Sequence, residues 1–227
     1  MSNKIKIIDF HSHVLPCADH GSDSIETSIW QIDLAISHGV NIVIATPHFY
    51  PHSHTVEGFL KRRDESFKQL KKRLPRGIKV IVGAEVFVCP GIENLPQLDR
   101  LFVKDTKTLL LELPFDSFEE CYCDSVKAMV DKGINVVLAH ADRYPTVTVE
   151  KMLRSGALIQ INASALADIG RRKEVLSWVK RGVVVAIGSD IHGRDKKAYK
   201  KFVKAIKLLK NNSEDIFEKS YFLTKKA

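Results

Sequence analysis

Seven short apolar runs, most of them rich in β-branched residues, limit the folds that this chain of 227 residues can adopt. The runs occupy residues 4–10, 41–46, 78–85, 108–113, 134–140, 157–163 and 183–190. Near-continuous apolar runs of this length are typical of strands that are buried on both faces, as in a parallel sheet. Amphipathic patterns between them predict helices over 24–38, 56–74, 118–132, 173–181 and 196–210. Glycine, which ends helices readily, stands at the helix-to-strand joins: Gly39, Gly77, Gly133, Gly156 and Gly182.

Strands that alternate with helices predict a parallel α/β fold, either a closed barrel or an open doubly wound sheet. Nearly every run ends in a polar side chain that is capable of chemistry. These side chains are His11 and His13, His48, Glu85, Glu112, His140, Asn162, and Asp190 with His192. In a barrel the carboxyl ends of all strands meet at one mouth, whereas an open sheet gathers only those near its switch point. We therefore expect a single domain, residues 1–227, folded as a distorted seven-stranded (β/α)7 barrel.

Two histidines leave the first run two residues apart. Because side chains alternate along a strand, His11 and His13 project from the same side, roughly 7 Å apart at the backbone. That spacing suits chelation of one metal ion. Taken alone, the pair is equally compatible with two surface or capping histidines.

Ligand-type side chains recur after the later runs, and this recurrence favours a metal site. Buried Glu and Asp are costly unless they are paired or bound to a metal, and no Lys or Arg stands at a comparable strand end before Arg143. Imidazole and carboxylate ligands without thiolate favour manganese, iron or zinc over magnesium or calcium. Two or more such ions would hold a hydroxide that attacks phosphorus, so the pattern predicts a phosphoester hydrolase.

Six motifs together resemble the PHP (polymerase and histidinol phosphatase) superfamily. They are His-Ser-His at 11–13, Asp-His-Gly at 19–21, Thr-Pro-His at 46–48, Gly-Ala-Glu at 83–85, His-Ala-Asp-Arg-Tyr at 140–144 and Ser-Asp-Ile-His at 189–192. Their order and spacing are similar to the bacterial protein-tyrosine phosphatases that oppose tyrosine autokinases in capsule and exopolysaccharide synthesis. That branch commonly has Asp-Asp-Gly where this chain has Asp-His-Gly. The resemblance extends from His11 to beyond His192.

The resemblance implies a PHP-type barrel with three ions, manganese before iron or zinc, and a substrate protein that carries phosphotyrosine, namely a bacterial tyrosine kinase. The implied ligands of the first ion are His11, His13, Glu85 and Asp190. Glu85 would bridge to a second ion that is also bound by Glu112 and His140, and the third ion would be bound by His20, His48 and His192. Asp190 and His192 are therefore expected to take part in catalysis as well as in metal binding.

Two arginines are candidates for binding the phosphate. Arg143 follows His140 at the expected mouth of the barrel, and Arg194 follows His192; both can offer a bidentate fork, and both resemble substrate-binding arginines of the family. Arg194 is also compatible with a surface role. A cysteine-dependent tyrosine phosphatase is excluded, because no cysteine has an arginine six residues later, where that mechanism needs one to bind phosphate.

Composition leaves two other functions open. The formal net charge of +8, with basic segments at 61–76 and 196–210, is compatible with an anionic partner or with solvated helix faces. A small phosphomonoester such as histidinol phosphate would suit the same ligands. A nucleic-acid-binding regulatory module is the third alternative, although nucleic acid is not expected, because no recognition motif or aromatic ladder is present. We expect a cytoplasmic protein, since the sequence shows neither a signal peptide nor a membrane-spanning run.

Overall fold

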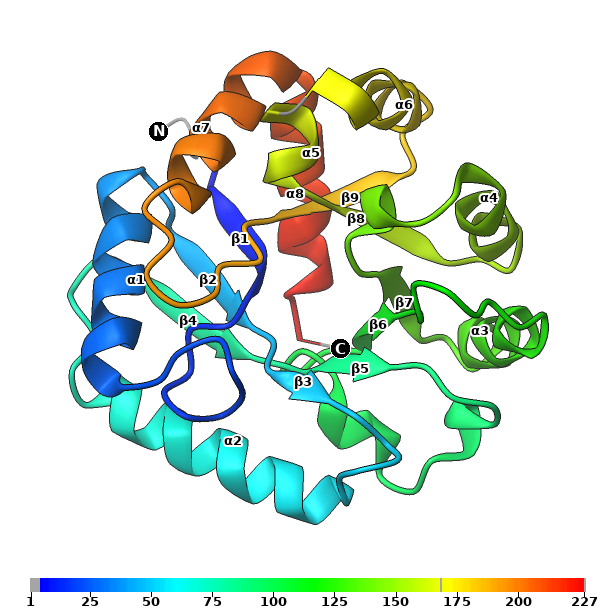
Figure 1. Ribbon diagram of the computed structural model, residues 1–227, viewed down its shortest axis with the longest axis horizontal. Helices are drawn as coiled ribbons and strands as arrows, with labels where there is room; N and C mark the ends of the chain where they lie inside the picture. Colours follow the sequence, from blue (N-terminus) through cyan, green and yellow to red (C-terminus); the bar gives the residue numbers. More distant parts are fainter. Residues whose placement is uncertain (1–4, 168, 227) are drawn as a thin grey trace.

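A computed structural model describes residues 5–167 and 169–226, and its strands form the wall of a barrel surrounded by helices (Figure 1). The strands are β1 (Ile8–Ser12), β2 (Ile42–Ala45), β3 (His48–Phe49), β4 (Lys79–Val82), β5 (Glu85–Phe87), β6 (Thr108–Glu112), β7 (Asn135–Leu138), β8 (Leu158–Asn162) and β9 (Val184–Gly188). All their pairings are parallel. Their order is β1-β2-β4 in one sheet and β3-β5-β6-β7-β8-β9 in the other.

The two sheets are successive parts of one wall, which is broken once after the predicted run 41–46 and once inside the predicted run 78–85. Pro47 lacks a backbone N–H and separates β2 from β3. Gly83 and Ala84 separate β4 from β5. Hydrogen bonds continue across both breaks, from Gly83 N–H to the Ala45 carbonyl (2.8 Å) and from Glu85 N–H to the Pro47 carbonyl (3.1 Å). The nine assigned strands therefore correspond to the seven predicted ones, and the predicted distorted (β/α)7 barrel is confirmed.

The first and last strands close the barrel. The backbone N–H of Asp190 donates to the His11 carbonyl (2.9 Å), and that of His13 donates to the Ile191 carbonyl (3.3 Å). β1 begins at Ile8, four residues after the start of the predicted run 4–10, and ends at Ser12, two residues after its end; the first residue of the run lies outside the described residues. This closure brings the carboxyl ends of β1 and β9 to the same part of the barrel mouth.

Helices pack around the wall, and one continuous hydrophobic core joins them to it. They are α1 (Ile25–Ser37), α2 (Val56–Lys71), α3 (Cys121–Asp131), α4 (Thr146–Arg154), α5 (Ala163–Ala167), α6 (Ile169–Lys180), α7 (Ala198–Leu209) and α8 (Asn212–Leu223), with 3-10 turns η1 (Ile92–Asn94), η2 (Leu98–Leu101) and η3 (Ala141–Arg143). The five predicted helices correspond to α1, α2, α3, α6 and α7, whereas α4, α5 and α8 were not predicted individually. Within the described ranges, no helix has the length and apolar character needed to cross a bilayer.

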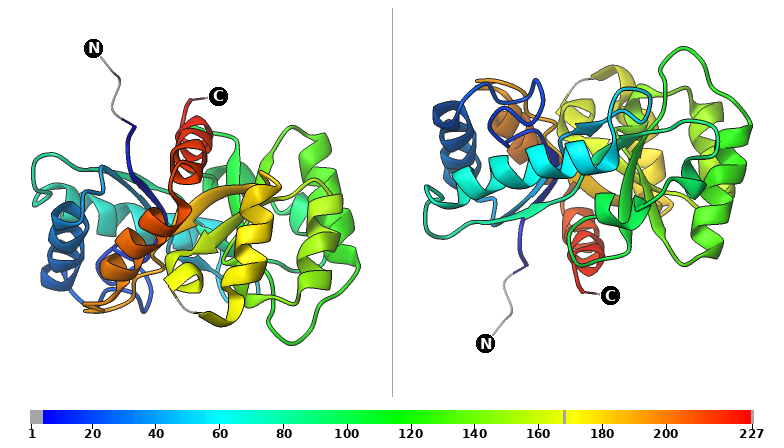
Figure 2. Two further views of the ribbon diagram at one scale, coloured as in Figure 1. Left: turned by 90° about the horizontal axis from the view of Figure 1, so that it is seen from above. Right: turned by 90° about the horizontal axis from the view of Figure 1, so that it is seen from below.

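Helix α8 covers the amino ends of the strands, on the opposite side from the loops that follow β1 and β9 (Figure 2). The hydroxyl of Thr108, at the start of β6, donates to the Leu223 carbonyl (2.9 Å). The hydroxyl of Ser220 donates to the Val185 carbonyl near the start of β9 (2.8 Å). The carboxyl ends of the strands therefore form the open end of the barrel.

Gly188, the last residue of β9, lies where the barrel wall has no room for a side chain. A Cβ at this position would lie 2.6 Å from His11 Cβ and 2.7 Å from Gln160 Nε2. We predict that Gly188→Ala lowers the free energy of unfolding by about 1–3 kcal/mol, measured by urea denaturation, because the crowded neighbours must move. Gly170→Ala in α6, where no atom of the described residues lies within 4 Å of the added Cβ, is the control and should not destabilise the protein. Equal stability of both variants would contradict the close packing at β9.

Candidate metal centre

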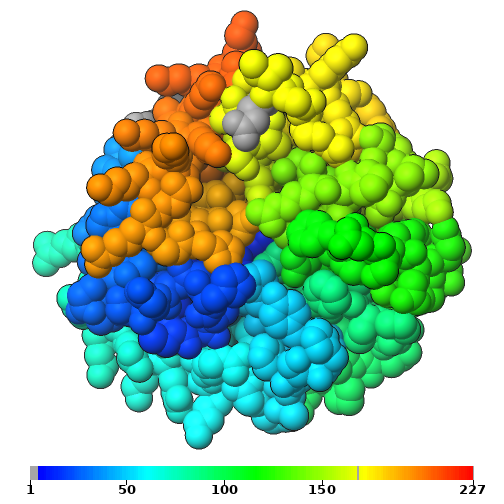
Figure 3. Space-filling model, in the orientation of Figure 1, coloured from blue at the N-terminus to red at the C-terminus, as the bar shows by residue number. Residues whose placement is uncertain are grey.

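Histidines and carboxylates from strands far apart in the sequence meet at the open end of the barrel. In the space-filling view, segments from the start, middle and end of the chain meet at the centre of this face (Figure 3). Several side chains lie within ion-pair distance of one another or belong to a group that could hold one metal ion. They are His11, His13, His48, Glu85, Glu112, His140, Asp190 and His192. All are buried except Asp190 and His192, which are partly exposed.

The two histidines of β1 direct the same ring nitrogen toward the centre. His11 Nε2 and His13 Nε2 are 3.1 Å apart. Glu85 Oε2 lies 3.3 Å from the first nitrogen and 3.4 Å from the second. Asp190 Oδ1 lies 3.7 Å and 3.4 Å from the same two atoms. Two imidazoles and two carboxylates therefore converge on one point.

Hydrogen bonds on the outer side of each ring fix this orientation. Gln160 Oε1 accepts the backbone N–H of His140 (2.7 Å), so it is also the acceptor for His11 Nδ1–H (3.1 Å). Asp19 Oδ2 accepts His13 Nδ1–H (2.7 Å). In their neutral forms, both rings thus carry the proton on Nδ1 and present the Nε2 lone pair to a metal ion. Ligand histidines are commonly oriented in this way.

A second part of the cluster lies beside Glu85 and Glu112. His140 Nε2 is 2.9 Å from Glu85 Oε1 and 3.3 Å from Glu112 Oε1. His48 Nδ1 is 2.8 Å from Glu85 Oε2 and 3.8 Å from Glu112 Oε2. Glu85 therefore contacts histidines with both of its oxygens, which suits a carboxylate that bridges two ions.

Unsatisfied polar atoms test whether a metal fits these residues. Three ligand groups have atoms within 4.8 Å of one another: His13, His48 and His192; His11, His13 and Glu85; and His48, Glu85 and Glu112. Among the described residues, His48 Nδ1, Glu85 Oε2 and His192 Nε2 are buried without a hydrogen-bond partner. Each such atom costs about 1–3 kcal/mol if it stays unsatisfied. A divalent cation would satisfy all three, so the donor set fits a metal centre.

Charge is concentrated at the centre of the cluster. Burial alone would lower the pKa of His13, but hydrogen bonds to Asp19 and two further carboxylates raise that pKa well above its usual range. Burial alone would raise the pKa of Glu85, yet the adjacent histidines hold it well below its usual range. Burial is likewise outweighed by Glu112 and Glu85 at His140, whose pKa is raised to about 9. Protons therefore occupy the metal-free cluster, and bound cations would displace them.

Two ligand-type residues adopt left-handed backbone conformations directly after their strands. The φ angle is 31° at His140, after β7, and 51° at Asp190, after β9. Such a conformation costs a residue other than glycine about 1–3 kcal/mol. The two strained residues are therefore ones whose side chains enter the cluster just beyond the end of a strand.

His192 and His20 lie at the outer edge of the cluster. His192 Nδ1 donates to the Asp190 carbonyl (3.1 Å), and burial together with the charge on His13 lowers the pKa of His192 to about 4. Its Nε2 therefore keeps a free lone pair at neutral pH. His20 is exposed, and its ring stacks on those of His48 and His192, with centroids 4.8 Å away in each case. Among the described residues, His13 rather than His20 completes the ligand group with His48 and His192.

The two candidate arginines differ in position. Arg143, in η3, donates to Asp190 Oδ2 from a side chain that is 42% exposed, so its guanidinium lies beside the cluster and open to solvent. Asp190 Oδ2 also accepts a hydrogen bond from Asn162 (3.1 Å). Arg194 is exposed and contacts the Thr27 hydroxyl at the start of α1 (3.4 Å). The structure thus brings Arg143, but not Arg194, into contact with a ligand-type residue.

Several residues that support the cluster were not among the candidates from the sequence. The Gln160 amide donates to Asn162 Oδ1 (3.0 Å), which links the partners of His11 and Asp190. Asp19 also accepts the backbone N–H of His48 (3.0 Å). Gln160 is a polar residue inside the apolar run 157–163, and this is the signal that could have identified it; Asn162, near the end of the same run, was already among the polar side chains noted at strand ends.

Asp9 joins the first and last strands. Its Oδ1 accepts the backbone N–H of Ser189 (2.8 Å), and its Oδ2 accepts the hydroxyls of Ser189 (2.6 Å) and Tyr199 (2.7 Å). Burial raises the pKa of Asp9 despite these hydrogen bonds. Asp9 precedes His11 by two residues and Ser189 precedes Asp190, so this contact sets the distance between two parts of the cluster.

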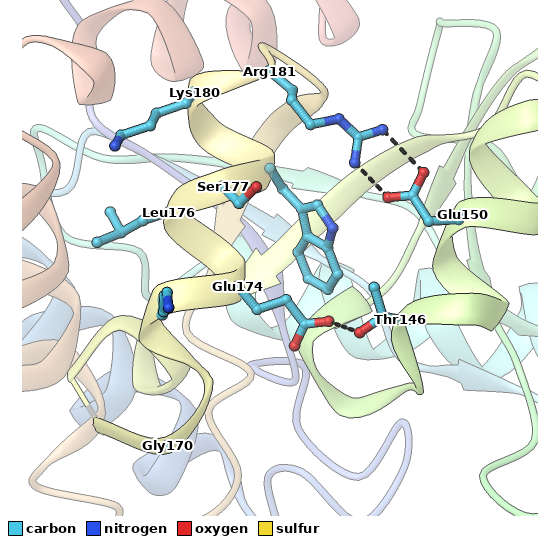
Figure 4. Close-up of a pocket in the computed structure, with 10 residues that line it drawn as sticks. Thr146, Glu150, Gly170, Glu174, Leu176, Ser177, Lys180 and Arg181 are labelled. Atoms are coloured by element: carbon cyan, nitrogen blue, oxygen red, sulfur yellow. Dashed lines mark hydrogen bonds and ion pairs between the residues drawn. The ribbon is translucent and has the colours of Figure 1, made fainter.

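A surface pocket of about 660 Å³ lies outside the barrel, between α4 and α6 (Figure 4). Across it Arg181 pairs with Glu150, and Thr146 donates to Glu174. These polar groups are already paired with one another. They do not converge on a common point as the groups at the barrel mouth do, so the barrel mouth is the candidate site.

A barrel that gathers histidines and carboxylates at the carboxyl ends of its parallel strands, with an arginine at the edge, has the fold of the PHP-type phosphatases and a donor set that suits divalent metal ions. The chain belongs to the capsular polysaccharide synthesis family CpsB/CapC, whose model matches residues 7–224. This result confirms the family resemblance seen in the six motifs.

Individual relatives agree with this membership. The chain is 29% identical to tyrosine-protein phosphatase YwqE of Bacillus subtilis over 198 residues, which cover 82% of this chain and 77% of the relative. It shares its fold with the solved YwqE and CpsB structures from Bacillus subtilis and Streptococcus pneumoniae, described as metal-dependent tyrosine phosphatases (TM-score 0.81, 23% identity, 96% and 94% coverage). Histidinol phosphate phosphatase of Lactococcus lactis has a similar fold (TM-score 0.60, 18% identity, 89% and 93% coverage).

We predict that Asp19→Asn lowers metal affinity by about 10–100-fold, because Asp19 orients His13 and increases the basicity of its free nitrogen. Competition with a chromogenic chelator measures the affinity, and metal analysis gives the stoichiometry. Asp33→Asn, an exposed substitution on α1, is the matched control and should bind metal as the wild type does. Wild-type affinity in Asp19→Asn would show that His13 needs no such partner.

Proposed function

We propose that this chain is a metal-dependent protein-tyrosine phosphatase that acts on phosphotyrosine of a bacterial tyrosine kinase in polysaccharide synthesis. The observation that carries the proposal is the buried cluster of histidines and carboxylates with Arg143 beside it. Membership of the CpsB/CapC family and the similarity to YwqE, a tyrosine-protein phosphatase, support the choice of substrate.

We also propose a centre of three divalent ions; the donor set supports more than one ion position, and the order of manganese before iron or zinc follows from the family resemblance. His11, His13, Glu85 and Asp190 converge on one position, and Glu85 has its second oxygen directed to His140 beside Glu112. His48 and His192 border a further position, which His13 also faces. We assign His20, stacked on both of these rings, to the outer side of this position.

The residues of the chain divide the chemistry between them. Divalent ions bound here would supply a water of lowered pKa and neutralise charge on the phosphoryl group. Arg143 can hold the phosphoryl oxygens through its forked N–H groups, for which it must leave Asp190. Asp190 then keeps its hydrogen bond from Asn162 while its other oxygen faces the histidines. Gln160 and Asp19 keep His11 and His13 in the tautomers that leave their inner nitrogens free.

We predict that the purified protein hydrolyses a phosphotyrosine peptide, that dialysis against a chelator abolishes this activity, and that added Mn²⁺ restores it. His13→Ala should lower kcat by at least about a thousandfold, because the substitution removes a ligand nitrogen from the centre of the cluster. His38→Ala is the control, since His38 bonds to the Leu34 carbonyl at the end of α1, away from the cluster. Histidinol phosphate is assayed in parallel, and a strong preference for it would overturn the choice of substrate.

We predict that Arg143→Ala lowers kcat/KM for the phosphotyrosine peptide by about 10–100-fold, the loss expected for charge-assisted hydrogen bonds to phosphate. Arg194→Ala should change kcat/KM by less than about threefold, because Arg194 contacts Thr27 instead of the cluster. Steady-state kinetics and metal content are measured for both variants. An equal loss in the two variants would contradict the distinction between the arginines.

A further inference from the structure

An aromatic ring is exposed immediately beside the metal centre. Phe115 lies in the loop between β6 and α3, and its side chain is 54% exposed. One face of the ring stacks on His140, with centroids 5.9 Å apart and planes inclined by 22°. A large apolar side chain left in solvent next to a polar cluster is more informative than a scattered surface residue.

The ring of Phe115 is supported from below. It also stacks on Tyr144, with centroids 5.7 Å apart and an interplanar angle of 25°. Tyr144 is itself buried, and its hydroxyl accepts the Leu113 N–H (3.0 Å) and donates to the Leu113 carbonyl (3.1 Å). These contacts hold the base of the loop, so the exposed ring has a defined position.

A second aromatic ring lies against another histidine that faces Glu85 and Glu112. Tyr50, just after β3, stacks on His48 with centroids 5.4 Å apart and lies 5.8 Å from the ring of Phe87. His48 and His140 both face Glu85 and Glu112. Each of these histidines also has an aromatic ring against it, Tyr50 on His48 and Phe115 on His140. Arg143, three residues after His140, faces Asp190. The mouth therefore has an aromatic part over β3 to β6 and a cationic part beyond β7.

We propose that Phe115, with Tyr50 as the second ring, is a specificity-determining surface that binds the aryl group of aromatic phosphomonoesters. The inference rests on the proposed function and deepens it. When the phosphoryl group lies between the cluster and Arg143, only the ester oxygen separates it from the leaving group. An aromatic leaving group, one ester oxygen away from the phosphoryl group, can stack on the exposed ring of Phe115, whereas the short alkyl chain of phosphoserine cannot.

Binding of phosphonates tests this surface without hydrolysis. Affinities of the Mn²⁺-loaded protein for phenylphosphonate, methylphosphonate and inorganic phosphate are measured by calorimetry. Wild type should prefer phenylphosphonate, and Phe115→Leu should lower the ratio of phenyl to methyl affinity by roughly two- to tenfold, because leucine keeps apolar area without a ring face. Phe222→Leu replaces an exposed phenylalanine on α8, at the opposite end of the barrel, and should leave the ratio unchanged.

Two results would overturn the inference. One is an unchanged ratio in Phe115→Leu. The other is an equal loss of affinity for all three anions together with lost metal, which would mean that Phe115 only covers His140. Kinetics separate this question from the proposed function: Phe115→Leu should raise KM for a phosphotyrosine peptide, with little change in kcat, and leave a matched phosphoserine peptide unaffected. Failure of the wild type to hydrolyse phosphotyrosine would overturn the proposed function, while the phosphonate ratios still decide the role of Phe115.

Discussion

The contact between the first and last strands is the constraint on which the candidate site depends. His11 and His13 leave β1, whereas Asp190 and His192 follow β9, and only closure of the barrel places them together. Backbone hydrogen bonds between the two strand ends make this closure, and buried Asp9 reinforces it by binding Ser189 and Tyr199. The Asp9 carboxylate therefore links the closure of the barrel to the geometry of the cluster, because Asp9 and Ser189 each lie within two residues of ligand-type side chains.

The cluster that results is costly for the folded state when no cation is present. Histidines and carboxylates are buried within about 3–4 Å of one another, and several polar atoms among the described residues lack hydrogen-bond partners. Replacing buried ion pairs by apolar residues is often neutral or stabilising, so stability alone gives no reason to keep them. The left-handed conformations of His140 and Asp190 add to this cost. A bound cation relieves the unsatisfied atoms, which is why the arrangement indicates metal binding rather than structural pairing.

Much of this organisation could be predicted from the sequence, because it repeats along the chain. Apolar runs followed by ligand-type residues identified the barrel and the strand ends that carry His48, Glu85 and His140. The breaks at Pro47 and at Gly83–Ala84 were not predicted, because Pro47 and β3 lie beyond the predicted run 41–46, and Gly83–Ala84 lies inside the run 78–85, which otherwise looks continuous. Helix α8 was also missed, because its role comes from long-range contacts with the start of β6 and β9. Loops carry no periodic pattern, so the exposed position of His20 and the turn of Arg194 toward Thr27 could not be foreseen.

The contrast between strands, which follow a repeating pattern, and loops, which do not, also explains why the chemistry of the cluster was easier to predict than the choice of substrate. Strand ends fix the ligands and Arg143, and their residue types state directly what they can bind. Phe115 has no such signal, because a phenylalanine in a loop is unremarkable until its ring is seen against His140 and Tyr144. In barrels of this kind the loops vary while the wall is fixed, so a common phosphate chemistry can be combined with different leaving groups. An aromatic ring beside the candidate ligands, opposite a cationic side, is the arrangement by which the proposed surface would distinguish an aryl phosphate from an alkyl phosphate without altering the centre itself.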